Sequence, residues 1–501
     1  MIALGLVAIA PPTDSDSLHY HLGVPLQWFR AGSIRPTPFW LHSRLTGLGE
    51  ALILFGLAMG TDCLGSVLNW VGLVFIVVAV AAWMPNSRVR PAAILLVTAP
   101  PILTFLVSTQ KTQLYPIAAI LSAIVVFRSR RRSLSTGTFW LAFASIAFAI
   151  ACKHSFLFSA MPATTIGLIE AKRRGMLGRS VALLVLAVAL FPLPLFVRNY
   201  VFYGDPISPL LERLRTDHDP VVLAFAGYLR NFAGDHTFKN LAKLPILFVI
   251  PTSLRRLNGA LGVGVLAILL VRGGRRTDWT MLRATFLLTG VLLIFGQWSS
   301  RFFLEPYLWM SIAVSRDLRK SPARLFQMGL LMQGILTLAI SLRGVWTLTP
   351  GVMDAGHREA TLNAVAIDFS LLKALDKVLP ADAIVTGMSP NHTNVPRPFL
   401  ASDYFRMLEA TKLSDSEKRR RIKEIFDRSG VNSFVIYTPD VVDPFGRLVG
   451  SETRVLGSLP KTTRSSRNPF AAESAVDVKI YRYRPSRQGP VREDKEDLGP
   501  R

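Results

Sequence analysis

Cysteine is nearly absent from this chain of 501 residues. The two cysteines, Cys63 and Cys152, both lie inside apolar segments. Two such residues form no disulfide framework, and they supply too few thiolates for a structural metal site. Cysteine usage therefore says nothing about the redox compartment of the protein.

Acidic residues are also scarce, because 33 Asp and Glu stand against 57 Lys and Arg and leave a formal net charge of +24. Such an excess can indicate a nucleic-acid partner. Here, however, the basic residues form short clusters between apolar runs, as the positive-inside rule for membrane proteins requires. We therefore expect membrane lipids, and no nucleic acid, as partners. The clusters are residues 128–132, 172–174, 272–276 and 316–320.

Half of the residues are hydrophobic, and most of these are gathered in long runs. Runs of about 15 to 20 apolar residues can cross a bilayer as helices. Residues 1–10 form a shorter run, which we interpret as the end of a first span. We predict a polytopic α-helical membrane protein with about 10 to 11 spans, the first one truncated. The other spans are residues 67–84, 92–107, 114–127, 138–151, 156–169, 181–197, 257–271, 281–297, 303–314 and 325–342.

The topology depends on the apolar stretch 47–59, which is short, holds three glycines and carries Glu50 near its start. If it crossed the membrane, the clusters at 128–132 and 272–276 would lie on the outer face, against the positive-inside rule. We therefore predict a juxtamembrane or re-entrant helix there. This choice places on the outer face the loops 11–66 and 198–258, the connection 108–113, and everything after residue 343. Glu50 and Asp62 are then expected to be solvated.

The tail differs from the membrane part, residues 1–343. Its pattern predicts short helices at 371–378 and 416–429 and strands at 383–386, 431–437 and 476–483. Such alternation indicates a soluble external α/β domain over residues 344–484. Residues 485–501 are charged and contain proline and glycine, so we expect disorder there.

Ionisable residues are concentrated directly after the first apolar run, where Asp14, Asp16, His19 and His21 fall within eight residues. Ser15 or Asp16 can cap a helix over residues 18–30, whose apolar face, with Leu22, Leu26 and Phe29, is expected to lie on the bilayer surface. On spacing alone, the carboxylates are either simple caps or catalytic groups.

A divalent metal is an alternative reading of the same loop. His19, His21 and His42 could bind one together with Asp14 or Asp16, since imidazole and carboxylate ligands suit zinc or manganese. No motif in the sequence specifies a cofactor, and we assign no metal ligand.

The run Asp16-Ser17-Leu18-His19-Tyr20-His21-Leu22, followed by a proline and then Gly32, resembles the first outer loop of bacterial GT-C glycosyltransferases. The resemblance is to the family 39 group, which includes protein mannosyltransferases and lipid A sugar transferases. Its members place an aspartate just after the first span, often with a tyrosine four positions on, as Asp16 and Tyr20 are here. Many also have an acidic residue directly after the aspartate. That position is Ser17 here, which leaves Asp14 as the reserve carboxylate.

Three further segments resemble the same family. Residues 198–209 are similar to an Arg-Asn, Gly-Asn-Pro segment at the outer end of a middle span, with Asp205 in place of the asparagine. Residues 301–306 resemble an Arg-aromatic and proline motif at the start of a late span. Lys153 matches a recurrent lysine at a span end, where it runs against the positive-inside bias. The matches cover the membrane part, about two thirds of the chain by length.

The resemblance implies an inverting glycosyltransferase that moves a sugar from a polyprenyl-phosphate donor to a lipid, glycan or protein of the cell envelope. One carboxylate, expected to be Asp16, takes the acceptor hydroxyl proton as the bond to the phosphate breaks. The departing phosphate needs cations or hydrogen-bond donors. Arg198 and Arg301 could instead reach from span ends to lipid headgroups. The expected phosphate ligands are Lys153, Arg198 and Arg301, and the expected helpers are His19, Tyr20 and His21.

These expectations describe a multi-pass protein of the bacterial inner membrane whose active site and tail face the periplasm or exterior. The alternative function is a transporter or flippase of lipid-linked saccharides, which also needs outer-face cations beside a hydrophobic groove. Transporters commonly show inverted repeats and charges at mid-bilayer, and the sequence shows neither. A third candidate function is a non-catalytic membrane anchor for the tail, and such an anchor would not need the acidic residues of the opening loop.

Overall fold

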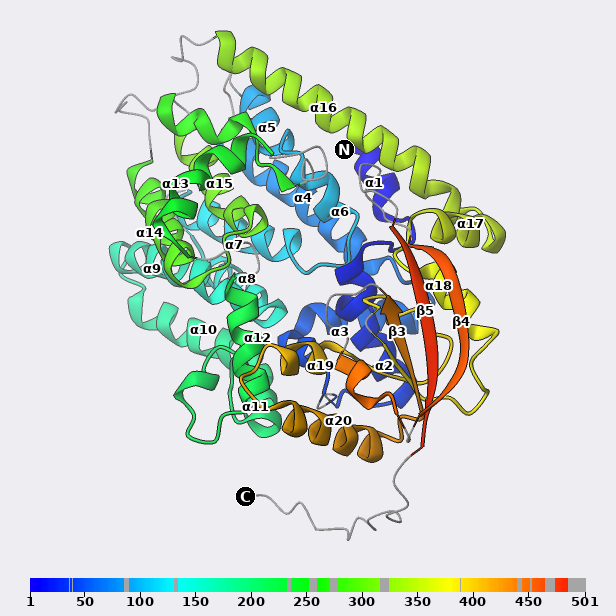
Figure 1. The fold of residues 1–501 in the computed structure, drawn as a ribbon. Helices are drawn as coiled ribbons and strands as arrows, with labels where there is room; N and C mark the ends of the chain where they lie inside the picture. The colour runs from blue at the N-terminus through cyan, green and yellow to red at the C-terminus, as the bar shows by residue number, and fades with distance from the viewer. Residues whose placement is uncertain are drawn as a thin grey trace.

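The computed structural model is mainly helical with one small sheet (Figure 1). It describes residues 1–484 apart from short gaps, so the tail predicted to be disordered, 485–501, lies outside the described residues. The basic clusters at 272–276 and 316–320 lie outside them as well. The gaps are residues 36, 38, 85–89, 130–133, 232–235, 252–258, 271–277, 316–323, 388, 439–443, 451–452 and 465–473.

Apolar helices from the first 348 residues pack side by side in the upper and left part of Figure 1. Glycine permits some of the closest approaches: a Cβ added to Gly72 of α4 would stand 2.5 Å from the backbone nitrogen of Tyr115 in α7. Small residues have this role at helix contacts in membranes. The helices are α1 (Ile2–Ala8), α4 (Leu64–Trp83), α5 (Arg90–Thr98), α6 (Ile102–Val107), α7 (Leu114–Phe127), α8 (Thr136–Cys152), α9 (Leu157–Arg173), α10 (Leu177–Leu190), α11 (Pro192–Tyr203), α12 (Pro220–Asn231), α13 (Phe238–Val249), α14 (Trp279–Phe295), α15 (Ser300–Val314) and α16 (Arg324–Leu348).

Two of the described helices are long and apolar enough to cross a membrane unaided, Leu64–Trp83 and Phe326–Val352. The pair α10 and α11 qualifies as one span if its 44° bend is allowed. Pro192 opens α11 and explains the bend, because proline has no N–H for the helical hydrogen-bond ladder. Prolines at 100 and 101 likewise divide the predicted span 92–107 into α5 and α6.

Two predicted segments differ from the structure. The predicted span 257–271 contains no described α-helix: its described residues, 259–270, include η6, a 3₁₀ helix at Val263–Leu270. The predicted outer loop 198–258 contains two helices, α12 and α13, besides the end of α11. In α12, Val221, Val222 and Phe225 are buried. Their helical spacing is the signal that predicts such a helix.

The opening loop holds four short elements: η1 (Ser17–His21), a π-helix; α2 (Gly23–Ala31); η2 (Leu41–Leu45), a 3₁₀ helix; and α3 (Leu48–Ala58). The short helix expected at 47–59 is confirmed as α3. The helix expected at 18–30 is present as η1 and α2. Its face with Val24 and Trp28 packs on Trp40 and on Ala401 of the tail, whereas Phe29 is 52% exposed.

The tail forms a five-stranded sheet of order β2-β1-β3-β5-β4 with helices beside it. β1 pairs in parallel with β2 and β3, whereas β5 pairs antiparallel with β3 and β4. The expected strands and helices are confirmed within a few residues; β2, β4, α17 and α19 are additional. The elements are α17 (Ala355–Val365), α18 (Phe369–Asp376), β1 (Val385–Gly387), β2 (Phe399–Leu400), α19 (Asp403–Glu409), α20 (Asp415–Ser429), β3 (Ser433–Thr438), β4 (Thr453–Arg464) and β5 (Ser474–Tyr483).

One hydrophobic core joins the tail to the membrane part. Leu41 of the opening loop and Phe225 of α12 are fully buried in the same cluster as Phe405, Phe426 and Phe434 of the tail. Side chains this size contribute about 1.5–3 kcal/mol each when buried. The tail is therefore held firmly over the opening loop and α12.

Candidate functional site

An open cavity lies where the opening loop meets the end of α8 and the helices α12, α14 and α15. Its wall brings together Asp16, Lys153 and Arg301, which are far apart in the sequence. Apolar side chains complete the wall, among them Phe158 and Phe295, whose rings stack at 6.5 Å. Such a cavity suits a ligand with a charged group and an apolar body.

Asp16 lies between two cations. Its Oδ2 atom is 2.7 Å from Nζ of Lys111 and 3.3 Å from Nη1 of Arg301. Burial raises the pKa of Asp16, but the positive charges of Lys111 and Arg301 outweigh this and hold it well below its usual value. The carboxylate is therefore ionised at neutral pH and acts as an acceptor.

The guanidinium of Arg301 is held in place on one side and keeps a hydrogen-bond donor available for a ligand. Nη2 donates to Oε1 of Gln297 at 3.1 Å, and the guanidinium lies 5.1 Å from the centroid of the Phe302 ring. Among the described residues, Nε of Arg301 is buried without a hydrogen-bond partner. A buried donor of this kind costs about 1–3 kcal/mol, so an anion in the cavity would find a donor already in place.

Lys153 follows the last residue of α8, where the chain becomes extended. Its Nζ lies 5.5 Å from the centroid of the Phe302 ring. Burial, and then the nearby charge of Arg301, lower its pKa to about 7. Lys153 therefore exchanges its proton near neutral pH, and a bound anion would favour the charged form.

His21 and Glu50 form a buried pair beside Asp16. Nδ1 of His21 is 2.7 Å from Oε1 of Glu50, and the two side chains are only 2% and 3% exposed. Burial lowers the pKa of His21, while the hydrogen bond to Glu50 opposes this. Glu50 also accepts from the backbone N–H of Gly47 at 2.8 Å. The expectation that Glu50 is solvated was wrong, because this residue caps α3 and orients an imidazole.

The two aspartates of the opening loop have different roles. Asp14 accepts from the backbone N–H of Ser17 at 3.1 Å, which is the geometry of a helix cap. Ser17 in turn accepts from the backbone N–H of Gln110 at 2.8 Å. The serine at this position therefore anchors the 108–113 connection, and that connection carries Lys111 to Asp16.

Arg198 is absent from the described cavity wall. Its Nη2 atom donates to the backbone oxygen of Thr46 at 2.9 Å and to Oδ1 of Asn199 at 2.9 Å. It thus supports the residues that lead into α3. Asp205, in the same motif, accepts from the backbone N–H groups of Ile207 and Leu211 and fixes the following turn.

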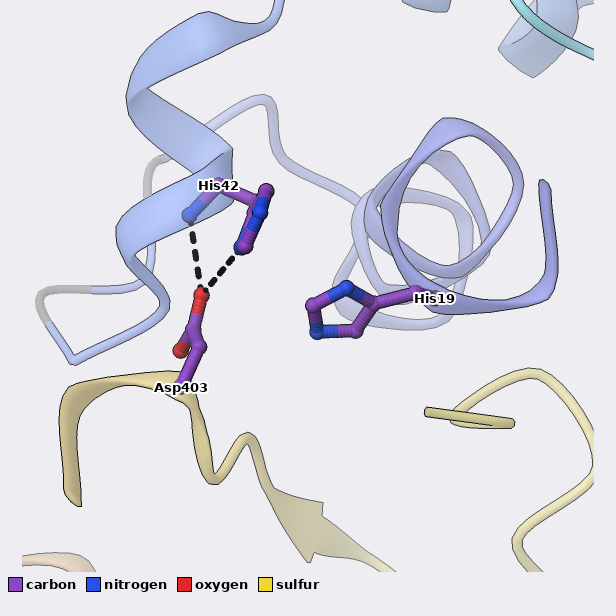
Figure 2. Close-up of side chains that lie close together, drawn as sticks. All are labelled: His19, His42 and Asp403. Carbon is purple, nitrogen blue, oxygen red and sulfur yellow. Dashed lines mark hydrogen bonds and ion pairs between the residues drawn. The ribbon is translucent and has the colours of Figure 1, made fainter. Parts of the chain in front are cut away.

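His19 and Tyr20 both lie against His42 of the opening loop, and Tyr20 also lines the cavity. The Tyr20 ring stacks on His42 with a centroid distance of 4.9 Å, and His19 lies 4.6 Å from His42 by the same measure. His42 Nδ1 is 2.8 Å from Oδ2 of Asp403 (Figure 2). Burial, and then the neighbouring His42, lower the pKa of His19 to about 3, so its imidazole is neutral. His19, His42 and Asp403 are the described residues that could hold a metal.

Sequence reasoning named His42 but missed its partner Asp403, and it also missed Lys111 and the buried role of Glu50. Lys111 had a usable signal, because a lysine in a short connection predicted to lie on the outer face runs against the positive-inside bias, as Lys153 does. Asp403 had none, since it lies 361 residues from His42 in the chain. Asp62, expected to be solvated, is partly exposed and pairs with Arg358 of the tail.

Comparison with known proteins gives a family and a fold. The family model of the DUF1420 N-terminal domain matches residues 1–362. No curated protein matches the chain. Two crystal structures of ArnT from Cupriavidus metallidurans are similar in structure at 11% sequence identity, with 96% of each chain covered. The TM-score is 0.57 for the structure bound to undecaprenyl phosphate and 0.51 for the apo state. The fold is that of a polytopic helical membrane protein.

Proposed function

The chain belongs to the family defined by the DUF1420 N-terminal domain, and from this and its fold we propose that it is a membrane glycosyltransferase. It takes a sugar from a polyprenyl-phosphate donor and transfers it, with inversion, to a lipid, glycan or protein of the cell envelope. ArnT, which shares the fold, has been crystallised with undecaprenyl phosphate. The observation that carries the proposal is the position of Asp16 between Lys111 and Arg301 in a cavity with an apolar wall.

The cations suit a leaving phosphate. A glycosyl phosphate donor carries a negative charge that grows as the glycosidic bond breaks, so donors fixed beforehand at that place stabilise the transition state. Arg301 supplies a guanidinium with a free Nε donor, and Lys153 supplies an amine that the phosphate would charge. Lys111 adds a third positive charge behind Asp16. Arg198 contributes indirectly, by supporting the chain that leads into α3.

The polyprenyl chain needs a path to the cavity. Phe295 of α14 lines the cavity and is 65% exposed, and it stacks on Phe158 of α9. An exposed aromatic side chain on an apolar membrane helix faces lipid. The lipid tail would leave between α9 and α14, while the phosphate stays at Arg301 and Lys153.

Asp16 is the proposed base, and its environment explains when it acts. While it is paired with Lys111 and Arg301, its low pKa makes it a weak proton acceptor, because a general base works best with a pKa near the ambient pH. A donor phosphate attracts the same two cations and weakens their hold on the carboxylate. The pKa of Asp16 then rises, and the carboxylate can take the acceptor proton. Asp14 serves as a cap in this scheme.

His21 is the alternative base. It lines the cavity, is neutral, and is oriented by Glu50 at 2.7 Å. A carboxylate that holds an imidazole in one orientation is a common arrangement for general-base catalysis. Tyr20 and His19, the other expected helpers, lie against His42 and position the loop.

The test is transfer of a labelled sugar from polyprenyl phosphate by the purified full chain in lipid nanodiscs, with membrane lipid extract as acceptor. Asp16→Asn should reduce turnover by at least about 100-fold, the usual contribution of a general base. Asp217→Asn, at an exposed ion pair with Arg215, is the matched control and should leave turnover unchanged. Full activity of Asp16→Asn together with loss in His21→Gln would move the base to His21. Movement of intact donor across the bilayer without transfer would favour the flippase alternative.

A further inference from the structure

Three side chains of the kinds that bind metal ions come together beside the cavity from distant parts of the chain. His19 comes from η1, His42 from η2, and Asp403 begins α19; one ligand atom of each lies within 4.8 Å of those of the other two. In Figure 2 the His19 ring points towards the hydrogen-bonded pair of His42 and Asp403. We propose that His19, His42 and Asp403 bind a divalent transition-metal ion, and that this ion holds the tail against the opening loop. The ligand types, two imidazoles and one carboxylate, identify the ion as zinc.

The distances fit such an ion after a small adjustment. Zinc binds imidazole and carboxylate at about 2.0–2.2 Å in a tetrahedral arrangement, which puts ligand atoms about 3.4 Å apart. The pair His42 and Asp403 is already closer, at 2.8 Å, because a hydrogen bond joins the two side chains. Metal binding would replace this hydrogen bond, and His19 would approach. Two imidazoles and one carboxylate suit zinc better than magnesium or calcium, which prefer oxygen ligands.

A fourth imidazole provides independent support. The ring of His392, from the segment before β2, lies 4.5 Å from the ring of His19 between centroids, and its side chain is buried at 3% exposure. Among the described residues, neither nitrogen of the His392 ring has a hydrogen-bond partner. Two buried nitrogen atoms without partners cost free energy. His392 lies outside the group of three whose ligand atoms are mutually close, so its ring would have to shift to give the metal at His19 a fourth protein ligand.

The proposed ion would stabilise the contact between the tail and the loop that carries Asp16. His19 is three residues after Asp16, and His42 lines the cavity. Besides the His42–Asp403 pair and the shared hydrophobic core, the existing links at this contact include hydrogen bonds from Thr393 to the backbone oxygen of Leu18, at 3.1 Å from nitrogen and 2.8 Å from Oγ1. A metal bond is much less reversible than these. The site is therefore structural, and it does not depend on which reaction the cavity supports.

Metal content is the first measurement. The full chain, purified in detergent from cells grown with added zinc, should contain about one zinc per chain by mass spectrometry of the elements. Asp403→Asn and His42→Gln should each reduce the content at least fivefold, and His392→Gln should reduce it less. His357→Gln is the matched control, because His357 is also hydrogen-bonded to an aspartate, Asp354, but on the exposed surface. Its zinc content should equal that of the wild type.

A second measurement follows the unfolding of the wild-type protein, so its result does not depend on whether the variants fold. Wild-type protein treated with a chelator should unfold at a lower temperature, and zinc should restore the original midpoint. Cobalt added to the treated protein should produce the visible absorption of a tetrahedral site, absent in Asp403→Asn. Wild-type protein with less than one zinc per ten chains, and no shift of the midpoint with zinc, would overturn the proposal. This result is separate from the transfer assay, because neither measurement involves a sugar donor.

Discussion

Nζ of Lys111 lies 2.7 Å from Oδ2 of Asp16, and the lysine side chain is almost completely buried, at 8% exposure. A buried lysine is costly unless it is paired. Its ammonium group also lies over the ring of Phe105, 4.4 Å from the centroid. The pair therefore sets the charge state of the carboxylate that we propose as the base.

Lys111→Met should weaken the proposed activity in a characteristic way. Lys111 is the leading source of the positive charge that keeps the pKa of Asp16 low, so its removal raises that pKa towards the ordinary value near 4 or above. A depressed pKa keeps the carboxylate ionised as the pH falls; in the variant, protonation begins at higher pH. The expected acid limb of turnover, measured from pH 4.5 to 8, moves to higher pH. Turnover should also fall about tenfold, because one of the three positive charges proposed to stabilise the leaving phosphate is removed.

The control for this prediction is Lys373→Gln, at an exposed ion pair with Glu359 in the tail. It should change neither turnover nor its pH dependence, since exposed pairs contribute little. Lys111→Arg should keep most of the charge effect. An unchanged acid limb in Lys111→Met would mean that Asp16 does not determine the rate.

Donor binding should depend on pH through Lys153. Its pKa, about 7 in the free protein, rises when a phosphate binds, so binding takes up a proton above pH 7. Affinity should therefore fall between pH 7 and 9, by up to about tenfold per unit. The ligand should be a polyprenyl phosphodiester, whose single charge is constant over this range. Arg301, Lys111, Glu50 and Asp16 are the charged groups that act on Lys153.

Lys153→Arg separates this effect from others. Arginine stays charged at every pH used, so the variant should bind the phosphodiester with almost no pH dependence. Equal pH slopes for the wild type and the variant would assign the proton uptake to another group.

The sequence predicts helices better than it predicts contacts. The periodic run at residues 114–127 has the same bounds as α7, and α20 begins one residue before its prediction. Hydrophobic periodicity is a local property, so it is visible in the chain. The break between α10 and α11 had a local signal in Pro192. The 3₁₀ form of η6 has no such signal in the apolar run 257–271, and the predicted span there is wrong for its described residues.

The candidate site shows the same limit. Asp16 and Arg301 were expected at one site because both match a family motif, and the structure brings them within 3.3 Å. Asp403 and Glu50 gain their roles from contacts with His42 and His21, which no local pattern records. Arg198 has the expected motif, but its guanidinium is directed to Thr46. Motifs thus indicate the loops that meet, and only the fold determines which side chains touch.

Glu50→Ala should destabilise the protein strongly. Glu50 is the acceptor for both His21 and the backbone N–H of Gly47, at 2.7 and 2.8 Å, inside a site with almost no exposure. Removing one member of a buried pair costs about 3–5 kcal/mol. Glu50→Gln keeps an acceptor and should cost about 1–2 kcal/mol. Unfolding midpoints measured in the same detergent should follow the order wild type, Gln, Ala; equal midpoints for Ala and wild type would contradict the structural role.

Gly47→Ala should separate the opening loop from the end of α8. A Cβ at this position would stand 2.5 Å from the backbone oxygen of Ala151 and 2.7 Å from that of Cys152, neither of which can move without shifting Lys153. Overpacking of this kind costs about 1–3 kcal/mol. We expect a lower unfolding midpoint together with weaker binding of the polyprenyl phosphodiester, because the shift displaces the Lys153 amine. Gly178→Ala is the matched control: a Cβ there meets nothing within 4 Å, and α10 should gain about 0.5–1 kcal/mol. A Gly47→Ala protein as stable as the Gly178→Ala protein would show that the loop and α8 are not packed as the structure has them.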